Sequence, residues 1–262
     1  INTTYPFVTD HEKIEDCIDE LVDYAEDSIP VLSETKELLG VITAQDVVEA
    51  VDDEMGEDYA KLAGLTDEED LRETTKESMK KRLPWLIILL FLGMGVSSVV
   101  GAFEAVVAVL PIVMCFQSLI LDMAGNVGTQ SLAVTIRVLM DENLTGKQKL
   151  HLVWKEMKVG FVNGLLLGSL AFVFIGIYIA CFKHNAWLHA FLISGCVGVS
   201  LMVAMVISSL VGTLIPIFFH KIKIDPAVAS GPLITTVNDL VAVVTYYGLA
   251  WLFLIQIMQI VS

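Results

Sequence analysis

An acidic residue, Asp239, lies about two turns or more inside the last long apolar segment of the chain. A carboxylate at the centre of a membrane-spanning helix costs on the order of 2.5–3.5 kcal/mol, so its presence there needs a reason. Gly231 and Thr235 precede it by eight and four residues and share its helical face. The small side chains of Gly231 and Thr235 leave space for backbone carbonyl oxygens near the carboxylate. Pro232 removes one backbone hydrogen bond of this helix and can free a neighbouring carbonyl. This is the outline of a cation site; a buried aspartate bonded to a neighbouring helix is the structural alternative.

A second polar interruption lies in an earlier apolar segment. Asp122 is followed by the glycine-rich stretch 124–130, Ala-Gly-Asn-Val-Gly-Thr-Gln, which predicts a break in the helix. Non-helical backbone inside a bilayer is tolerated where it is buried in protein or lines a water-filled cavity. We therefore expect two interrupted segments to border one pathway. Glu104 and Asp225 fall at segment ends, and Asp225, just before Pro226, is expected to cap the following helix.

Carboxylates also crowd one predicted helix nearer the N-terminus, residues 44–65. Pairs of like charge recur there at i, i+4: Glu49–Asp53, Asp53–Glu57 and Glu54–Asp58. Each such pair opposes helix formation by roughly 0.2–0.5 kcal/mol. Divalent cations would remove this repulsion, because carboxylate oxygens are the natural ligands of Mg²⁺ and Ca²⁺. A solvated acidic face is the plainer interpretation.

These residues need long apolar helices to position them, and a bilayer core requires roughly 20 apolar residues per helix. Five runs reach that length: residues 84–103, 105–139, 159–182, 187–219 and 226–261. Lys and Arg gather before the first run, between the second and third, and between the fourth and fifth. By the positive-inside rule, the N-terminal part is expected in the cytosol and the C-terminus outside. Gly160, Gly164 and Gly168 predict close packing of the third helix against a neighbour.

Composition divides the chain into two parts of different character. Residues 1–82 hold 24 of the 31 acidic and 8 of the 16 basic residues, a net charge of −16, whereas residues 83–262 carry +1. The chain is 55% hydrophobic with a mean hydropathy of +0.69, which argues against a soluble enzyme. Nucleic acids are poor partners, because they require clustered Lys and Arg. No Cys or His spacing predicts a zinc site or a disulfide framework, and no catalytic arrangement is present.

The acidic head is predicted to form strand, turn, strand and helix over residues 28–51, preceded by a helix around residues 14–22. Its segment Gly40-Val41-Ile42-Thr43, followed by Asp46, resembles a CBS domain. CBS modules work in pairs and one is present, so we expect the sequence to be part of a longer protein. The resemblance gives Thr43 and Asp46 as candidate contacts for a nucleotide ribose.

The polar motifs of the apolar part resemble the MgtE family of magnesium channels and transporters. They are Ala124–Ser131 in the second span and, in the fifth, Asp225-Pro226-Ala227, Gly231-Pro232, Thr235-Thr236 and Asp239. Gly101-Ala102-Phe103-Glu104 is similar to the family's GFE segment with one small residue inserted, and Ala124 replaces the glycine common in the family. The order of parts also matches. It implies a partial α/β CBS unit (residues 1–51), an acidic plug or connecting helix with its linker (52–82), and a mainly α bundle of five transmembrane helices (83–262).

The resemblance implies a homodimer in the plasma (inner) membrane, with a pore between the protomers. The implied metal ligands are Asp239 of both copies, carbonyls at Gly231 and Thr235, and Asn126. Mg²⁺ gives up its water shell reluctantly, so it would be held through its waters. The membrane potential would drive import with ~2.3 kcal/mol per charge per 100 mV.

The resemblance also implies a gate that cytosolic Mg²⁺ closes. The acidic helix would act as a plug, and the implied regulatory ligands are Asp46, Glu54, Glu57, Asp58, Asp10 and Glu12. Bound metal would cancel the repulsion within the head, and loss of metal would let the head repel itself across the dimer and open the pore. Such linkage requires Mg²⁺ to bind the closed state more tightly.

Two other classes of function stay open. In a proton-coupled or exchange-type divalent cation carrier, Asp239 would titrate as the metal moves. In a membrane-tethered nucleotide sensor, the CBS part would carry the function without transport. The order of preference among Mg²⁺, Mn²⁺, Co²⁺ and Ca²⁺ does not follow from the residues.

Overall fold

The computed structural model describes residues 7–12, 28–66, 72–139, 144–183, 185–228 and 231–257. It separates into two units, residues 1–60 with 67–70 and residues 61–66 with 71–262. The helix predicted around residues 14–22, and Cys17 within it, lie outside the described residues.

The N-terminal unit is a small sheet followed by a helix. Its strands are β1 (Val8–Thr9), β2 (Ser28–Leu32) and β3 (Leu38–Thr43), with β1 parallel and β3 antiparallel to the central β2. Ile29 of β2 is buried against Val8 and against Val47 of helix α2 (Ala44–Leu62). Leu38 and Val41 of β3 leave more than half of their surface exposed. The order of strand, turn, strand and helix confirms the expected partial CBS fold.

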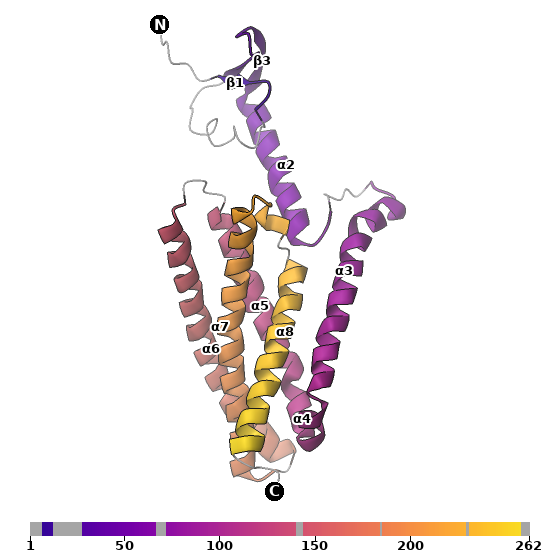
Figure 1. Ribbon diagram of the computed structural model, residues 1–262, viewed down its shortest axis with the longest axis vertical. Helices are drawn as coiled ribbons and strands as arrows, with labels where there is room; N and C mark the ends of the chain where they lie inside the picture. Colours follow the sequence, from indigo (N-terminus) through magenta and orange to yellow (C-terminus); the bar gives the residue numbers. More distant parts are fainter. Residues whose placement is uncertain are drawn as a thin grey trace. The chain divides into compact units, whose positions relative to one another are not determined.

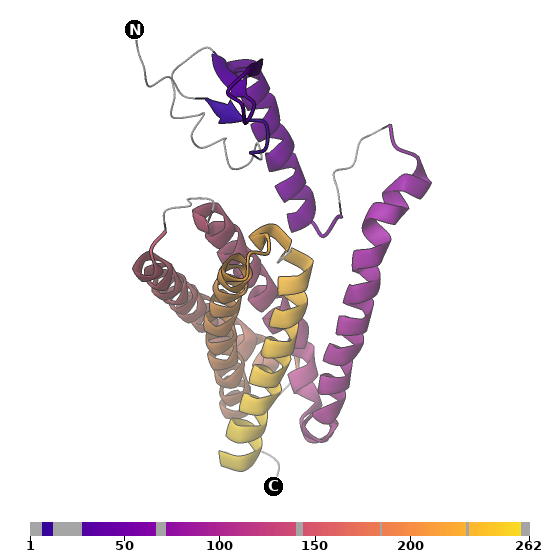
Figure 2. The ribbon, with the colours of Figure 1, turned by 45° about the horizontal axis from the view of Figure 1, so that its top comes forward.

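The second unit contains, within the described residues, five helices long and apolar enough to cross a membrane. They are α3 (Thr75–Ala102), α5 (Met114–Leu139) with the 3₁₀ turn η1 (Pro111–Val113) before it, α6 (Gly146–Phe182), α7 (Trp187–Lys221), and α8 (Gly231–Ala250), which continues as the π-helical turn η3 (Trp251–Ile257). Two short elements, α4 (Glu104–Val109) and η2 (Pro226–Val228), complete it. The predicted helical bundle of five spans is confirmed. α3 lies at the edge of this bundle, beside α8 (Figures 1 and 2).

The second span is broken at a different place from the one predicted. α5 continues without interruption through residues 124–130, so the break expected from the glycine-rich composition there is wrong. The backbone leaves the helix at Leu110, with φ −132° and ψ 73°, directly before Pro111. Proline lacks an N–H and disfavours helical geometry at the preceding residue. The glycines of α5 serve close packing instead.

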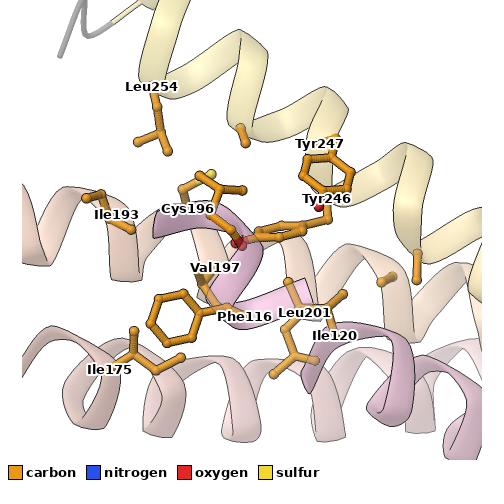
Figure 3. Packing of buried hydrophobic residues seen from close by; sticks show 14 of the residues in the cluster. Phe116, Ile120, Ile175, Ile193, Cys196, Val197, Leu201, Tyr246, Tyr247 and Leu254 are labelled. Carbon is orange, nitrogen blue, oxygen red and sulfur yellow. The ribbon is translucent and has the colours of Figure 1, made fainter. Parts of the chain in front are cut away.

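The core of the membrane unit surrounds α7, which packs against α5, α6 and α8. Apolar side chains from these helices meet in one cluster (Figure 3) that includes Phe116, Ile120, Ile175, Ile193, Cys196, Val197, Leu201, Tyr246, Tyr247 and Leu254. The Tyr246 hydroxyl donates to the carbonyl of Val113 at 2.8 Å, and the Tyr247 hydroxyl donates to the side-chain oxygen of Gln117. These bonds satisfy both buried hydroxyls and fix the C-terminal half of α8 against the start of α5.

Small residues bring α6 close to α7, as their spacing predicts. A Cβ added to Gly168 would lie 2.6 Å from the carbonyl oxygen of Gly198, and one added to Gly164 would lie 2.9 Å from the Cα of Met202. Gly160 faces Ser209 in the same way. Backbone contact of this kind drives association of helices in lipid, where burial of apolar surface between helices gains little.

Candidate metal pathway

Asp239 lies near the middle of α8 and is partly buried. Within the described residues, no side chain or backbone group donates a hydrogen bond to its carboxylate, and no cation pairs with it. Carboxylates held inside proteins are usually paired or hydrogen-bonded, because an isolated buried charge is costly. The structural alternative, an aspartate bonded to a neighbouring helix, therefore has no donor in this part of the chain.

The first turns of α8 carry the other predicted ligands. The Thr235 hydroxyl donates to the carbonyl oxygen of Gly231 at 2.9 Å, and the Thr236 hydroxyl donates to that of Pro232 at 2.9 Å. The Gly231 carbonyl also accepts the helical N–H of Thr235, so both of its lone pairs are engaged within α8. A hydrated ion would therefore have to replace the Thr235 hydroxyl to bind this oxygen. Gly231, Thr235 and Asp239 follow one another on one helical face, as the spacing predicts.

The two polar motifs, more than a hundred residues apart in sequence, pack against each other. A Cβ on Gly125 would lie 3.1 Å from Cγ2 of Thr235, and one on Gly128 would overlap the side chain of Asn238. The Thr129 hydroxyl donates to the carbonyl of Gly125 at 3.0 Å and lies 3.5 Å from the Thr235 hydroxyl. The motif in α5 thus positions the start of α8 while remaining helical itself.

α5 also carries a polar face, formed by Asp122, Asn126 and Gln130 at i, i+4 and i+8. All three side chains are exposed in the single chain. The Asn126 amide nitrogen donates to the carbonyl of Asp122 at 2.9 Å, and its side-chain oxygen accepts no bond within the described residues. Polar groups on a membrane-spanning helix face protein or water rather than lipid. The α5 polar face therefore requires a cover other than acyl chains.

The end of α2 meets the start of α8 inside the membrane unit. The Oδ2 of Asp225 accepts a hydrogen bond from the Lys61 ammonium at 2.8 Å, and its Oδ1 accepts the N–H of Ala227 at 2.8 Å, which confirms its predicted capping role. A Cβ on Gly231 would lie 3.2 Å from the carbonyl oxygen of Leu62, the last residue of α2. Lys61 and Leu62, the last two residues of α2, thus lie against the segment that leads to Asp239.

Comparison with known proteins assigns this arrangement to a family. The MgtE family model, described as a divalent cation transporter, matches residues 117–249, a range that holds both polar motifs. The chain belongs to the MgtE family. A CBS-domain model matches residues 1–53, in agreement with the sheet and helix of the head. The MgtE family consists of transporters and not of enzymes.

Three MgtE relatives align with most of the chain. It is 37% identical over 240 residues to the magnesium transporter MgtE of Enterococcus faecalis, covering 92% of this chain and 51% of the relative. It is 38% identical to that of Bacillus subtilis (87% and 48%) and 32% identical to that of Thermus thermophilus (89% and 50%). The chain spans about half the length of the curated relatives it matches.

Within the head of this MgtE chain, Asp46 caps its own helix. Its Oδ2 accepts hydrogen bonds from the Thr43 backbone N–H and the Thr43 hydroxyl, both at 2.7 Å. These two bonds, the backbone bond first, hold the pKa of the Asp46 carboxyl below its ordinary value. Thr43 and Asp46 are therefore engaged with each other, and a nucleotide or a metal ion would compete with this cap.

The other predicted regulatory ligands are dispersed. In the part of the chain that the structure describes, no three His, Cys, Asp or Glu side chains gather closely enough to hold a metal ion. Asp10 and Glu57 are exposed, Asp58 is half-buried, and Glu12 accepts the Thr9 N–H at 3.1 Å; the side chain of Glu54 lies outside the described set. Their role as metal ligands stays a prediction.

Two buried polar residues of the membrane unit are not predicted by the sequence pattern. Glu156 of α6 is 5% exposed and accepts the Ser131 hydroxyl at 3.0 Å. Its neighbours Lys155 and Lys158 suggested a polar connection, but its place one turn before Gly160, on the small-residue face, was a signal of burial. Asn238, next to Asp239, is fully buried, and both atoms of its amide lack a partner within the described residues.

Proposed function

We propose that this chain is the pore-forming part of a Mg²⁺-selective channel or transporter that imports Mg²⁺ down its electrochemical gradient. The observation that carries the proposal is the partly buried, unpartnered carboxylate of Asp239 on the face shared with Gly231 and Thr235. A hydrated divalent cation supplies the missing partner, since its waters donate to carboxylates and carbonyls. Relatives named magnesium transporters favour this ion.

The pore lies between two copies in this proposal. The α5 polar face is exposed in the single chain, and α3 has no buried residue. A twofold interface brings the same patch from each copy together, so two α5 polar faces would line one aqueous path. Two Asp239 carboxylates facing that path would match the charge of one Mg²⁺, and selection would follow the size and charge of the hydrated ion.

The orientation follows from the basic flanks of the spans, with the head in the cytosol and the C-terminus outside. A membrane potential negative inside then draws cations toward the head. The gain is ~2.3 kcal/mol per charge per 100 mV, or about twice that for a divalent ion, so no second ion is needed for import.

Cytosolic Mg²⁺ closes the pore by neutralising the head. The contact of Lys61 with Asp225, at 2.8 Å, gives the acidic helix α2 a direct connection to η2 and the start of α8. Mg²⁺ bound among the carboxylates would hold paired heads together, and α2 would then hold α8 in the closed position. The ion achieves this only if it binds the closed state more tightly than the open one.

The proposed transport is tested by Mg²⁺ flux into liposomes, comparing wild type with Asp239→Asn. A contact with a charged group contributes about 1.5–3 kcal/mol, so we expect the flux to fall about tenfold or more. Glu104→Gln, which neutralises an exposed acid at a helix end, is the matched control and should transport normally. Undiminished Mg²⁺ flux in Asp239→Asn would refute the proposed site. A fixed ratio of protons to Mg²⁺ ions transported would show a proton-coupled carrier instead of a channel.

The gate is tested with Glu57→Gln combined with Asp58→Asn. We expect closure to require several-fold more cytosolic Mg²⁺, because two carboxylates of α2 are lost. Glu34→Gln combined with Glu37→Gln removes the same charge from the exposed turn between β2 and β3 and serves as control. Equal Mg²⁺ dependence in both double variants would remove α2 as the sensor.

A further inference from the structure

Basic side chains gather at the start of α6 and at the end of α7. They are Lys147, Lys149, Lys155 and Lys158 in α6, and Lys221 and Lys223 at and after the end of α7. None of them makes an ion pair within the described residues. Lys61 and Lys81, in contrast, pair with Asp225 and Glu73 at 2.8 and 2.7 Å. Within the part of the chain that the structure describes, no acidic side chain neutralises these six lysines.

Two of the basic groups at this end touch each other. The Nζ of Lys149, near the start of α6, lies 3.2 Å from Nδ1 of His220, near the end of α7, and both side chains are partly buried. α6 and α7 are antiparallel, so these termini meet at the same end of the bundle (Figure 1). An ammonium has donors only, so Nδ1 is the acceptor and Nε2 of the neutral ring carries the proton. The pair presents N–H donors and no acceptor, which suits an anion.

Exposed aromatic side chains on the same stretches of α6 and α7 favour a membrane surface as the source of the anion. Trp154 of α6 and Phe218 of α7 are each 56% exposed, within six residues of Lys149 and His220. Exposed aromatic rings next to Lys side chains are typical of the headgroup level of a bilayer. Anionic phospholipids attract such basic groups with a free energy that corresponds to about a fivefold change in affinity per charge.

We propose that Lys149 and His220 form a phosphate site, occupied by the headgroup of an anionic phospholipid. The chain between His220 and Asp225 is short and structured: Ile224 N–H donates to the carbonyl of Phe219 at 2.9 Å, and Lys223 has φ of 60°. A headgroup held at His220 would therefore fix the turn that leads to Asp225 and η2. Transport would then depend on anionic lipid. This consequence rests on the proposed function.

The site is tested by native mass spectrometry of the full chain in detergent, with phosphatidylglycerol and phosphatidylcholine as probes. We expect phosphatidylglycerol to bind preferentially and Lys149→Gln, which removes a charge, to weaken its binding about fivefold. His220→Gln removes the neutral Nε2–H donor and should also weaken binding, but by less. Lys183→Gln, an exposed lysine just beyond the opposite end of α6, should leave binding unchanged. Lys149→Arg keeps the charge and should retain binding, which separates loss of the site from loss of the fold.

Competition with inorganic phosphate distinguishes the two sources of the anion. Displacement of phosphatidylglycerol only at high phosphate concentration supports a lipid site, and displacement at low concentration supports a site for free phosphate at the same pair. Equal weakening by Lys183→Gln, or no weakening by the two substitutions at the pair, would overturn the proposal. Because binding is read without Mg²⁺ flux, this outcome is independent of the Asp239→Asn result.

Discussion

Hydroxyl side chains inside the membrane unit mostly satisfy the backbone of their own helix. Thr129, Thr135, Thr213 and Thr235 each donate to the carbonyl four residues earlier, at 2.7–3.0 Å. Such bonds keep polar side chains inside a helix without a partner on another element. Asp239 is the contrast, because its acidic oxygens cannot be satisfied in this way and need a donor or a cation from outside the helix.

Glu156 is predicted to stabilise the junction of α5 and α6. Glu156→Leu leaves the buried Ser131 hydroxyl without its acceptor, and we expect a loss of about 1–3 kcal/mol. Glu156→Gln keeps an acceptor oxygen and should lose less. Thermal unfolding in detergent measures both, with Glu104→Gln as an exposed control. If Glu156→Leu and Glu156→Gln unfold at the same temperature, the hydrogen bond between Ser131 and Glu156 does not stabilise the fold.

Asp46 is predicted to stabilise the start of α2 in a pH-dependent way. Its pKa is lowered from the ordinary 3.8, so its contribution is fully present above that value and is lost as pH falls through the lowered value of the folded state. The difference in helix content between wild type and Asp46→Asn, followed by circular dichroism, should therefore shrink in acid. Asp52→Asn, at an exposed position of the same helix, should not differ from wild type at neutral pH. A difference that persists below the lowered pKa would rule out the cap as its cause.

At the scale of elements, two of the helix contacts in this protein are close approaches at glycine. α6 meets α7 through Gly160, Gly164 and Gly168, and α5 meets α8 through Gly125 and Gly128. The same residue type that predicts a broken helix in water is tolerated here, since helix pairs in lipid gain from close backbone approach. The actual break of the second span is due to Pro111.

Gly168→Ala is predicted to separate α6 from α7. The added Cβ would meet the backbone of Gly198, which cannot turn aside as a side chain can, and we expect a loss of about 1–3 kcal/mol. Gly93→Ala in α3, where nothing lies within 4 Å of the added Cβ, should be neutral or slightly stabilising. Equal shifts of the two variants in thermal unfolding would contradict the packing role of the stripe.

At the scale of the whole molecule, an acidic head with a net charge of −16 is joined to a nearly neutral membrane part. Self-repulsion of such a head grows when two copies are brought together, and divalent cations relieve it. The exposed α5 polar face requires protein or water as its cover, because lipid does not cover polar groups well. In the proposed dimer, the second copy supplies that cover.

The α5 polar face is predicted to lie at the interface of two copies. In a background in which the four native cysteines are replaced by serine, Asn126→Cys should form a disulfide-linked dimer under mild oxidation. Phe174→Cys, 68% exposed on the apolar surface of α6, should remain monomeric. Crosslinking of both variants to the same extent would indicate random collision rather than an interface.

Local residue patterns were sufficient to predict the membrane helices and the capping role of Asp225, and they single out Asp239, whose role as a metal ligand stays a prediction. Length, apolarity and charge along the chain determine whether a helix can cross a bilayer, and all three are properties of neighbouring residues. Tertiary structure alone decided that residues 124–130 stay helical, that Glu156 is buried, and that Lys149 meets His220. Each of these depends on a helix distant in sequence, whose side chains supply the contact or the space that local propensity cannot encode.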